Sequence, residues 1–186
     1  SKGGNIKLFN RDIEDWNITF VDTGLTANIG ERFKAVEKYL EGEEVFLANY
    51  SDGLTDLHLP TYIEHFHKLN KVGSFLCVRP SQSFHLVDMN EDGLVKDIQD
   101  VKQRDIWING GYFIFKKEIF KYINQGEELV LEPFQRLIAK QELFSYKYTG
   151  FFGVMDTFKE KQHLDDMYAQ GERPWEVWKN QQLEAA

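Results

Sequence analysis

Two aspartates, Asp52 and Asp156, stand where a carboxylate could hold a metal ion, because each directly follows an apolar segment. Asp52 ends the stretch "EEVFLANYSDG", and Asp156 follows "GFFGVM" and precedes a helical pattern. Ligands of open α/β sheets bind outside the carboxyl ends of the strands. Mg²⁺ prefers oxygen ligands and commonly takes one or two carboxylates together with substrate phosphates. The pair therefore predicts a magnesium site if the fold brings these two distant residues together.

Each aspartate also has a simpler interpretation. Asp52 and Gly53 form an Asp-Gly pair, which is common in turns, and on the tripeptide alone the turn is the favoured reading. Asp156 precedes a predicted helix and would serve as its N-cap, a frequent use of Asp. Neither simpler role requires the other residue.

A Gly pair next to an amide forms a second candidate site, in "WINGGYFIF". Asn109 offers both a hydrogen-bond donor and an acceptor, and Gly110 and Gly111 leave room beside it. This arrangement suits a hydroxyl-rich ligand that lies against the backbone. A bulge or tight bend within a strand explains the same residues equally well.

The segment "VDTGLTANIGERFK" is a third candidate, since Gly, Thr and Asn separate a predicted strand from a predicted helix that contains Arg32. Such a loop could bind a nucleotide through its backbone groups, or could simply connect two elements. It lacks the Gly-Lys-Ser/Thr ending of a Walker loop, so that motif is excluded.

Alternating strand and helix patterns position these residues. Strands are predicted at 16–24, 43–50 and 72–79, and helices at 30–40 and 60–70. This alternation indicates βαβ units and a doubly wound sheet. The strand at 43–50 is apolar almost throughout, which predicts burial on both faces in a central position.

The second half of the chain has a different pattern. A hairpin is predicted around "NEDG" within 83–101, because a turn signal separates two short strand-like segments. A strand at 107–115, a helix within 131–143, a strand at 144–153 and a closing helix at 156–170 follow.

Length and composition limit the classes of protein. The 186 residues predict a single domain, 1–186. A net charge of −8 argues against a nucleic-acid partner. Cys77 is the only cysteine, so no internal disulfide forms. No apolar run approaches the ~20 residues of a membrane span, and the first residues lack a secretory signal. We therefore expect a cytoplasmic protein that does not enter a membrane.

Taken in order, five segments resemble the sugar-phosphate nucleotidyltransferase family, most closely its glucose-1-phosphate cytidylyltransferases. These segments are "WNITFVDTGLTANIGERFKAV", "FLANYSDGLTDL", "WINGGYFIF", "LEPFQRLIAKQEL" and "GFFGVMDTFKEK" with the later "PWEVW". The resemblance implies an α/β, Rossmann-like nucleotidyltransferase fold with a mixed, mainly parallel sheet flanked by helices. It also implies that CTP and glucose 1-phosphate react to give CDP-glucose and pyrophosphate.

The resemblance further assigns roles to residues. Asp52 and Asp156 would be catalytic and would hold Mg²⁺. The nucleotide would contact Thr23, Gly24, Gly30, Arg32 and Gly53, and the sugar phosphate would contact Asn109, Gly110, Glu132 and Lys102. Lys102 is an offset substitute, since Asp100-Val101-Lys102 stands where the family has Glu-Lys-Pro.

The family's amino-terminal unit, with Gly-Gly-x-Gly-Thr-Arg-Leu, has no counterpart in this chain. We therefore expect a partial domain, either a fragment or a natural short relative, that turns over CTP poorly alone. An uncovered sheet edge would favour a homo-oligomer or association with the missing segment. The alternative function is a non-catalytic nucleotide- or sugar-binding relative that acts as a regulatory or interaction module.

Overall fold

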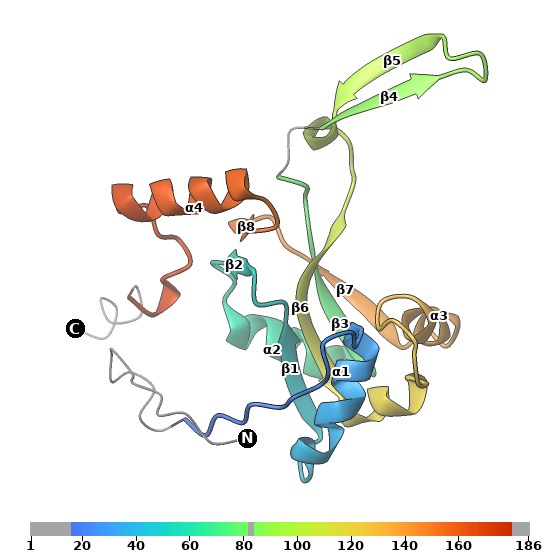
Figure 1. The fold of residues 1–186 in the computed structure, drawn as a ribbon, viewed down its shortest axis with the longest axis vertical. Helices are drawn as coiled ribbons and strands as arrows, with labels where there is room; N and C mark the ends of the chain where they lie inside the picture. The colour runs from blue at the N-terminus through green and yellow to red at the C-terminus, as the bar shows by residue number, and fades with distance from the viewer. Residues whose placement is uncertain (1–15, 82–83, 180–186) are drawn as a thin grey trace.

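A four-stranded mixed sheet forms the centre of the described chain, which comprises residues 16–81 and 84–179 of a computed structural model (Figure 1). The strand order is β1 (Val45–Asn49), β6 (Ile108–Lys116), β3 (Gly73–Val78) and β7 (Leu143–Lys147). β6 runs antiparallel to β1 and β3, whereas β3 and β7 are parallel. β1, β3 and β7 therefore point the same way, and their carboxyl ends lie at one edge of the sheet.

Helices cover both faces of this sheet. α1 (Ile29–Val36) and α3 (Glu132–Ala139) pack on one face, and α2 (Leu59–Leu69) packs on the other. The mixed sheet with flanking helices is the α/β fold that the sequence predicts. Short 3₁₀ helices follow α1 at Glu37–Leu40 and β6 at Lys117–Tyr122, and another, Val101–Gln103, lies at the base of the hairpin.

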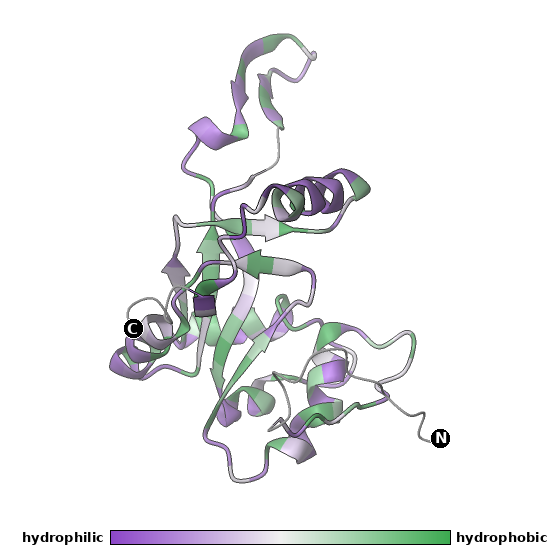
Figure 2. Ribbon diagram, turned by 90° about the vertical axis from the view of Figure 1, so that its left-hand side faces the viewer, coloured by the Kyte–Doolittle hydropathy of each residue, from purple (hydrophilic) through white to green (hydrophobic). Residues whose placement is uncertain are grey.

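Alternation along β6 divides the core into two clusters. Phe113 and Phe115 point to the face covered by α1 and α3, whereas Ile114 points to the face covered by α2. All three side chains are almost completely buried. Figure 2 shows hydrophobic residues concentrated in the central strands and hydrophilic residues along α4 (Phe158–Gln170).

Two smaller sheets lie beyond the carboxyl edge of the central sheet. β2 (Gly53–Thr55) pairs antiparallel with β8 (Phe152–Val154), and α4 follows β8. β4 (His85–Met89) and β5 (Val95–Asp100) form the predicted hairpin, which projects away from the body (Figure 1). Among the described residues, no helix is both long and apolar enough to cross a bilayer.

The strand predicted at 16–24 is wrong, because its described residues, from Trp16 onward, form no strand. Its apolar side chains face solvent: Trp16 is 68% exposed and Phe20 is 77% exposed. A strand requires a hydrogen-bonded neighbour, and within the described chain none pairs with this segment.

The prediction that 43–50 forms a buried central strand is also wrong. β1 is the edge strand of the described sheet, and Leu47 is 50% exposed. The apolar run correctly predicts a strand, but the place of that strand in the sheet depends on which other strands pair with it.

The single strand predicted at 144–153 is divided into β7 and β8 by a bend that Asp56 stabilises. The Asp56 carboxylate accepts a hydrogen bond from the Tyr148 hydroxyl and one from the Phe151 N–H, at 2.7 Å for the latter. Desolvation and the hydrogen bond to Asp56 raise the pKa of Tyr148. The bend redirects the chain so that β8 pairs with β2.

Candidate active site

The β2–β8 pair brings Asp52 and Asp156 together. Gly53 pairs with Val154, and the Met155 N–H donates to the Asp52 carbonyl oxygen at 3.0 Å. Asp52 thus lies just before β2 and Asp156 just after β8, at the same end of an antiparallel pair. The sequence predicts this meeting of two carboxylates 104 positions apart (156 − 52), although the catalytic and metal-binding roles themselves stay predictions.

The Asp52 carboxyl group lies close enough to Asp156 to affect its ionisation. Partial desolvation raises the pKa of Asp156, and the negative charges of Asp52 and Glu160 and a hydrogen bond with Asp52 raise it further. Within residues 16–81 and 84–179, no Lys, Arg or His side chain forms an ion pair with either aspartate. Two neighbouring carboxylates that no basic side chain neutralises form a site that favours the binding of a cation.

The donor set of this pair fits a hard cation that brings further ligands with it. The described residues contain no cluster of three or more His, Cys, Asp or Glu side chains that could hold a metal. Two carboxylates alone suit Mg²⁺, which usually keeps several waters and binds through one or two carboxylates plus substrate phosphates.

The simpler roles of the two aspartates have different outcomes. Asp52 does lie in a turn, with Ser51 before it. Asp156 is not the N-cap of α4, because Thr157 occupies that position in a capping box with Glu160. Thr157 can supply both the β-region backbone and the oxygen that a cap requires. The N-cap prediction for Asp156 is therefore wrong, and its carboxylate is free of that duty.

The Gly pair after Asn109 forms a bulge. Phe75 pairs with Phe113 and Cys77 with Asn109, so β6 carries extra residues opposite β3. Gly111 adopts φ +71°, a conformation that favours glycine, and a Cβ there would lie 2.4 Å from the Tyr50 ring. The bulge interpretation is confirmed, and contact of Asn109 and Gly110 with a sugar stays a prediction.

Tyr50 links the two candidate sites, and sequence analysis does not single it out. Its pKa is raised by desolvation and by the charges of Glu128 and Asp52, while a hydrogen bond with Asn109 lowers it. Tyr50 therefore lies near both Asn109 and Asp52. Its position directly after β1 and two residues before Asp52 is the only sequence signal for this role.

The predicted nucleotide-binding residues form mainly local contacts. The Gly24 N–H donates to Asp22, and the Arg32 guanidinium donates to the Ala27 carbonyl oxygen at 3.0 Å. Gly30 is buried on α1, where a Cβ would lie 2.1 Å from the Glu127 carbonyl oxygen. Thr23 also lies in this segment, before α1. Gly53 is the exception, since it adjoins Asp52 and its carbonyl accepts from the Tyr112 hydroxyl at 2.7 Å.

Two residues predicted to bind the sugar phosphate, Glu132 and Lys102, belong to elements other than the β2–β8 pair that carries the carboxylates. Glu132 is exposed at the start of α3, where its charge acts on Arg136. Lys102 lies on the 3₁₀ helix at the base of the hairpin, with its side chain exposed. Nothing in these contacts places either residue at the carboxylates, and their sugar-phosphate roles stay predictions.

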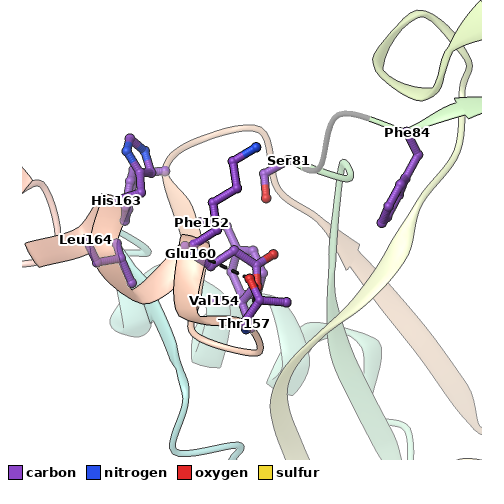
Figure 3. A pocket seen from close by; sticks show the side chains of 11 residues that line it. Ser81, Phe84, Phe152, Val154, Thr157, Glu160, His163 and Leu164 are labelled. Atoms are coloured by element: carbon purple, nitrogen blue, oxygen red, sulfur yellow. Dashed lines mark hydrogen bonds between the residues drawn. The ribbon is translucent and has the colours of Figure 1, made fainter. Parts of the chain in front are cut away.

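A cavity of about 460 Å³ lies next to the carboxylates, between α4, β8 and the chain that leads into the hairpin (Figure 3). Its wall is mostly apolar, with Phe84, Phe152 and Leu164 among the lining residues. Lys159 and His163 of α4 contribute polar groups. Asp52 and Asp156 do not line it, so the cavity adjoins the pair without enclosing it.

Curated proteins similar to this chain share one description. A Salmonella typhi glucose-1-phosphate cytidylyltransferase is 32% identical over 176 residues, which cover 93% of this chain and 68% of the relative. The chain belongs to the glucose-1-phosphate cytidylyltransferase family. A Bacillus subtilis relative, named "Probable glucose-1-phosphate cytidylyltransferase", is 28% identical and is covered to 70%. A scan against protein-family profiles gives no match.

Solved structures support the fold of this cytidylyltransferase-family member. A Bacillus anthracis protein assigned as a glucose-1-phosphate thymidylyltransferase matches 77% of the chain with a TM-score of 0.57 and 12% identity. HddC from Yersinia pseudotuberculosis matches 76% with a TM-score of 0.53 and 18% identity. The chain covers 62% of each of these two structures. At this identity, the likeness concerns the Rossmann-like fold alone.

Proposed function

We propose that this protein acts as a sugar-1-phosphate nucleotidyltransferase with CTP and glucose 1-phosphate as substrates. The names of the relatives support the substrates, and the meeting of Asp52 and Asp156 supports the chemistry. In the proposed reaction, an oxygen of the sugar phosphate attacks the α-phosphorus of CTP. The bond from that phosphorus to the bridging oxygen breaks, and pyrophosphate leaves.

The carboxylate pair is the observation that carries this proposal. Asp156 neither caps α4 nor forms an ion pair within the described chain. Desolvation and the negative charge of Asp52 both raise the pKa of the Asp156 carboxyl group. Bound to the two aspartates, Mg²⁺ would supply positive charge to the reacting phosphates. Positioning and charge neutralisation are the main needs of phosphoryl-type transfer. Asn109, beside Tyr50, is proposed to orient the sugar.

The test uses the chain at high concentration with radiolabelled glucose 1-phosphate, Mg²⁺ and each of the four nucleoside triphosphates in turn. We expect slow formation of labelled CDP-glucose, because the chain lacks the family's Gly-rich unit and loss of such donors costs roughly 10²–10³-fold each. The Asp156→Asn variant should abolish the product. Equal product with wild type and variant would contradict the proposal.

The same assay, combined with calorimetry, distinguishes the enzyme from the alternative, a non-catalytic binding module. A non-catalytic binding module would bind CDP-glucose in a calorimeter yet give no labelled product with any nucleotide. One observation favours this alternative. Gly24 and Arg32 form local contacts, and within the described residues neither contacts the carboxylate pair.

We also propose that the outer edge of β1 is covered in the functional assembly, either by a preceding segment or by a second copy of the chain. β1 lacks a second neighbour within the described residues, and Leu47 is 50% exposed. Unpaired strand edges promote association. Sedimentation velocity over a wide concentration range should show a dimer or larger species. A monomer throughout would contradict association of this chain with itself.

A further inference from the structure

A third carboxylate, that of Asp56, lies close to the candidate site but has no part in the proposed chemistry. It directly follows β2 and is half-buried. Within residues 16–81 and 84–179 it forms no ion pair with a Lys, Arg or His side chain. Its Oδ1 atom instead accepts from the Tyr148 hydroxyl and from the Phe151 N–H, which are 92 and 95 positions away. Hydrogen bonds to an ionised acceptor are stronger than those between neutral groups.

The two donors connect the carboxylate to different parts of the fold. The Tyr148 N–H donates to the Cys77 carbonyl oxygen at 2.8 Å, so Tyr148 is anchored to the end of β3 in the central sheet. Phe151 lies directly before β8, and its carbonyl oxygen accepts from the Thr55 hydroxyl at 2.8 Å. Asp56 therefore joins β2, the first residues of β8 and the central sheet at one point.

Gly150 shows that the bend between β7 and β8 is built around this carboxylate. A Cβ at Gly150 would lie 2.2 Å from the Tyr148 hydroxyl oxygen and 2.7 Å from Asp56 Oδ1. Only glycine allows the backbone to approach that closely. The chain between the two donors therefore packs directly against their shared acceptor.

The pairing of β2 with β8 carries this restraint to the candidate site. At one end of the pair the Asp56 N–H donates to the Phe151 carbonyl oxygen at 3.4 Å, and at the other end the Met155 N–H donates to the Asp52 carbonyl oxygen at 3.0 Å. Each strand has only three residues, and a two-stranded sheet is marginally stable by itself. A slip of one residue would turn the side chains of one strand to the other face, and Asp156 would no longer meet Asp52.

We propose that Asp56 is a positioning residue, which fixes the register of β2 against β8 and thereby holds Asp52 and Asp156 together for the cation. The inference rests on the proposed function only for the use of the pair in Mg²⁺ binding. Asp56 does not touch the cation or the substrates. It acts through the bend at Tyr148 and Phe151, five residues before Asp156.

The test combines two measurements on the whole chain. Hydrogen exchange followed by NMR reports the opening of the Met155 amide, which is bonded to Asp52, and calorimetry reports Mg²⁺ affinity. In Asp56→Ala, we expect the Met155 amide to exchange roughly 10- to 100-fold faster, because bonds to a charged acceptor are lost. Amides of β3 and β6 should keep their relative protection. Mg²⁺ should bind roughly tenfold more weakly, as for other residues that orient metal ligands.

Three further variants separate positioning from general stability. Asp56→Asn keeps an oxygen acceptor at the same place and should restore most of both properties. Tyr148→Phe removes one of the two donors and should change both properties in the same direction by less; it decides the question if Asp56→Ala does not fold. Glu142→Ala is the matched control, because the Glu142 carboxylate also accepts from a distant backbone N–H, that of Val72 at 3.2 Å, but before the first residues of β3 and β7. It should leave the Met155 amide and Mg²⁺ affinity unchanged.

Three results would overturn the inference. The first is unchanged Met155 exchange in Asp56→Ala, or in Tyr148→Phe where Asp56→Ala does not fold. The second is faster exchange with unchanged Mg²⁺ affinity in a wild type that binds the metal. The third is an equal loss in Glu142→Ala. A wild type that binds no Mg²⁺ would reject the proposed metal site, whereas the exchange rates would still decide whether Asp56 holds the two aspartates together.

Discussion

The Asp156→Asn variant is expected to bind Mg²⁺ at least roughly tenfold more weakly than the wild-type chain, without losing stability when no metal is present. Ligand charge sets the affinity of oxygen sites for divalent cations, and this change removes one of two carboxylates. In the metal-free chain the same carboxylate is unfavourable, since the negative charge of Asp52 helps raise its pKa. The substitution therefore weakens Mg²⁺ binding. In the absence of metal it leaves the stability of the fold unchanged or slightly increased.

The pH dependence of Asp156 has a definite sign. Its pKa in the folded chain is raised above the usual value for Asp, so the folded state binds this proton more tightly than the unfolded state. This group therefore stabilises the folded chain below its unfolded pKa, and the contribution is lost as pH rises through the folded pKa. Mg²⁺ competes with the proton, so wild-type affinity should increase over the same pH range.

Measurement of this prediction requires two titrations. Thermal unfolding with and without Mg²⁺ should show metal stabilisation of the wild type only, as expected for a ligand that binds the folded state. Calorimetric Mg²⁺ titrations across pH should show a proton-coupled affinity that Asp156→Asn lacks. Asp166→Asn is the control, because this α4 carboxylate is exposed and accepts only from Gln162 at 2.9 Å. Equal Mg²⁺ affinity in all three proteins would contradict a role of Asp156 in metal binding.

Local patterns in the sequence are sufficient to predict most of the elements around this site. The hairpin β4–β5, the strand β6 and the helices α2 and α4 form where turn signals, apolar runs and helical spacing indicate them. The approach of Asp52 and Asp156 could also be expected, because each follows a segment that ends at the functional edge. These features depend on interactions between residues that are near in the chain or on strand direction alone.

Features that depend on distant partners could not be predicted in this way. The β2–β8 pair has three residues in each strand, too few for a periodic pattern to be recognised. The segment 16–24 has the composition of a strand but forms none, since pairing requires a neighbour that composition does not reveal. The Lys147 ammonium lies 5.0 Å from the centre of the Trp107 ring, a contact between residues that are far apart in the sequence.

Gly30 shows how one residue can have two interpretations that stability measurements separate. The resemblance to nucleotidyltransferases assigns Gly30 to the nucleotide, while the structure places it in a close contact between α1 and the segment before α3. A Cβ at this position would lie 2.1 Å from the Glu127 carbonyl oxygen and 3.4 Å from the Leu129 amide nitrogen. Both contacts are with backbone, which cannot rotate away as a flexible side chain would.

The segment that meets Gly30 is held firmly in place. The Glu127 carboxylate binds the Arg136 guanidinium in two hydrogen bonds, one of them at 2.6 Å, and this pairing lowers the Glu127 pKa to about 2. The Ile29 N–H, next to Gly30, donates to the Glu128 carboxylate at 3.3 Å. Because Arg136 holds the segment and Ile29 joins α1 to it, a new methyl group has little room to be accommodated.

Gly30→Ala is therefore expected to destabilise the chain by about 3 kcal/mol, the upper part of the range for overpacking a close contact. The helix propensity of Ala, which is better than that of Gly by about 1 kcal/mol, offsets only part of the clash. For a chain of this size, the melting temperature should fall by roughly 6–12 °C. Arg32→Ala is the control on the same helix: its exposed side chain donates only to Ala27, so a loss below about 1 kcal/mol is expected. Unchanged melting of Gly30→Ala together with weaker CTP binding would instead favour the nucleotide-binding role.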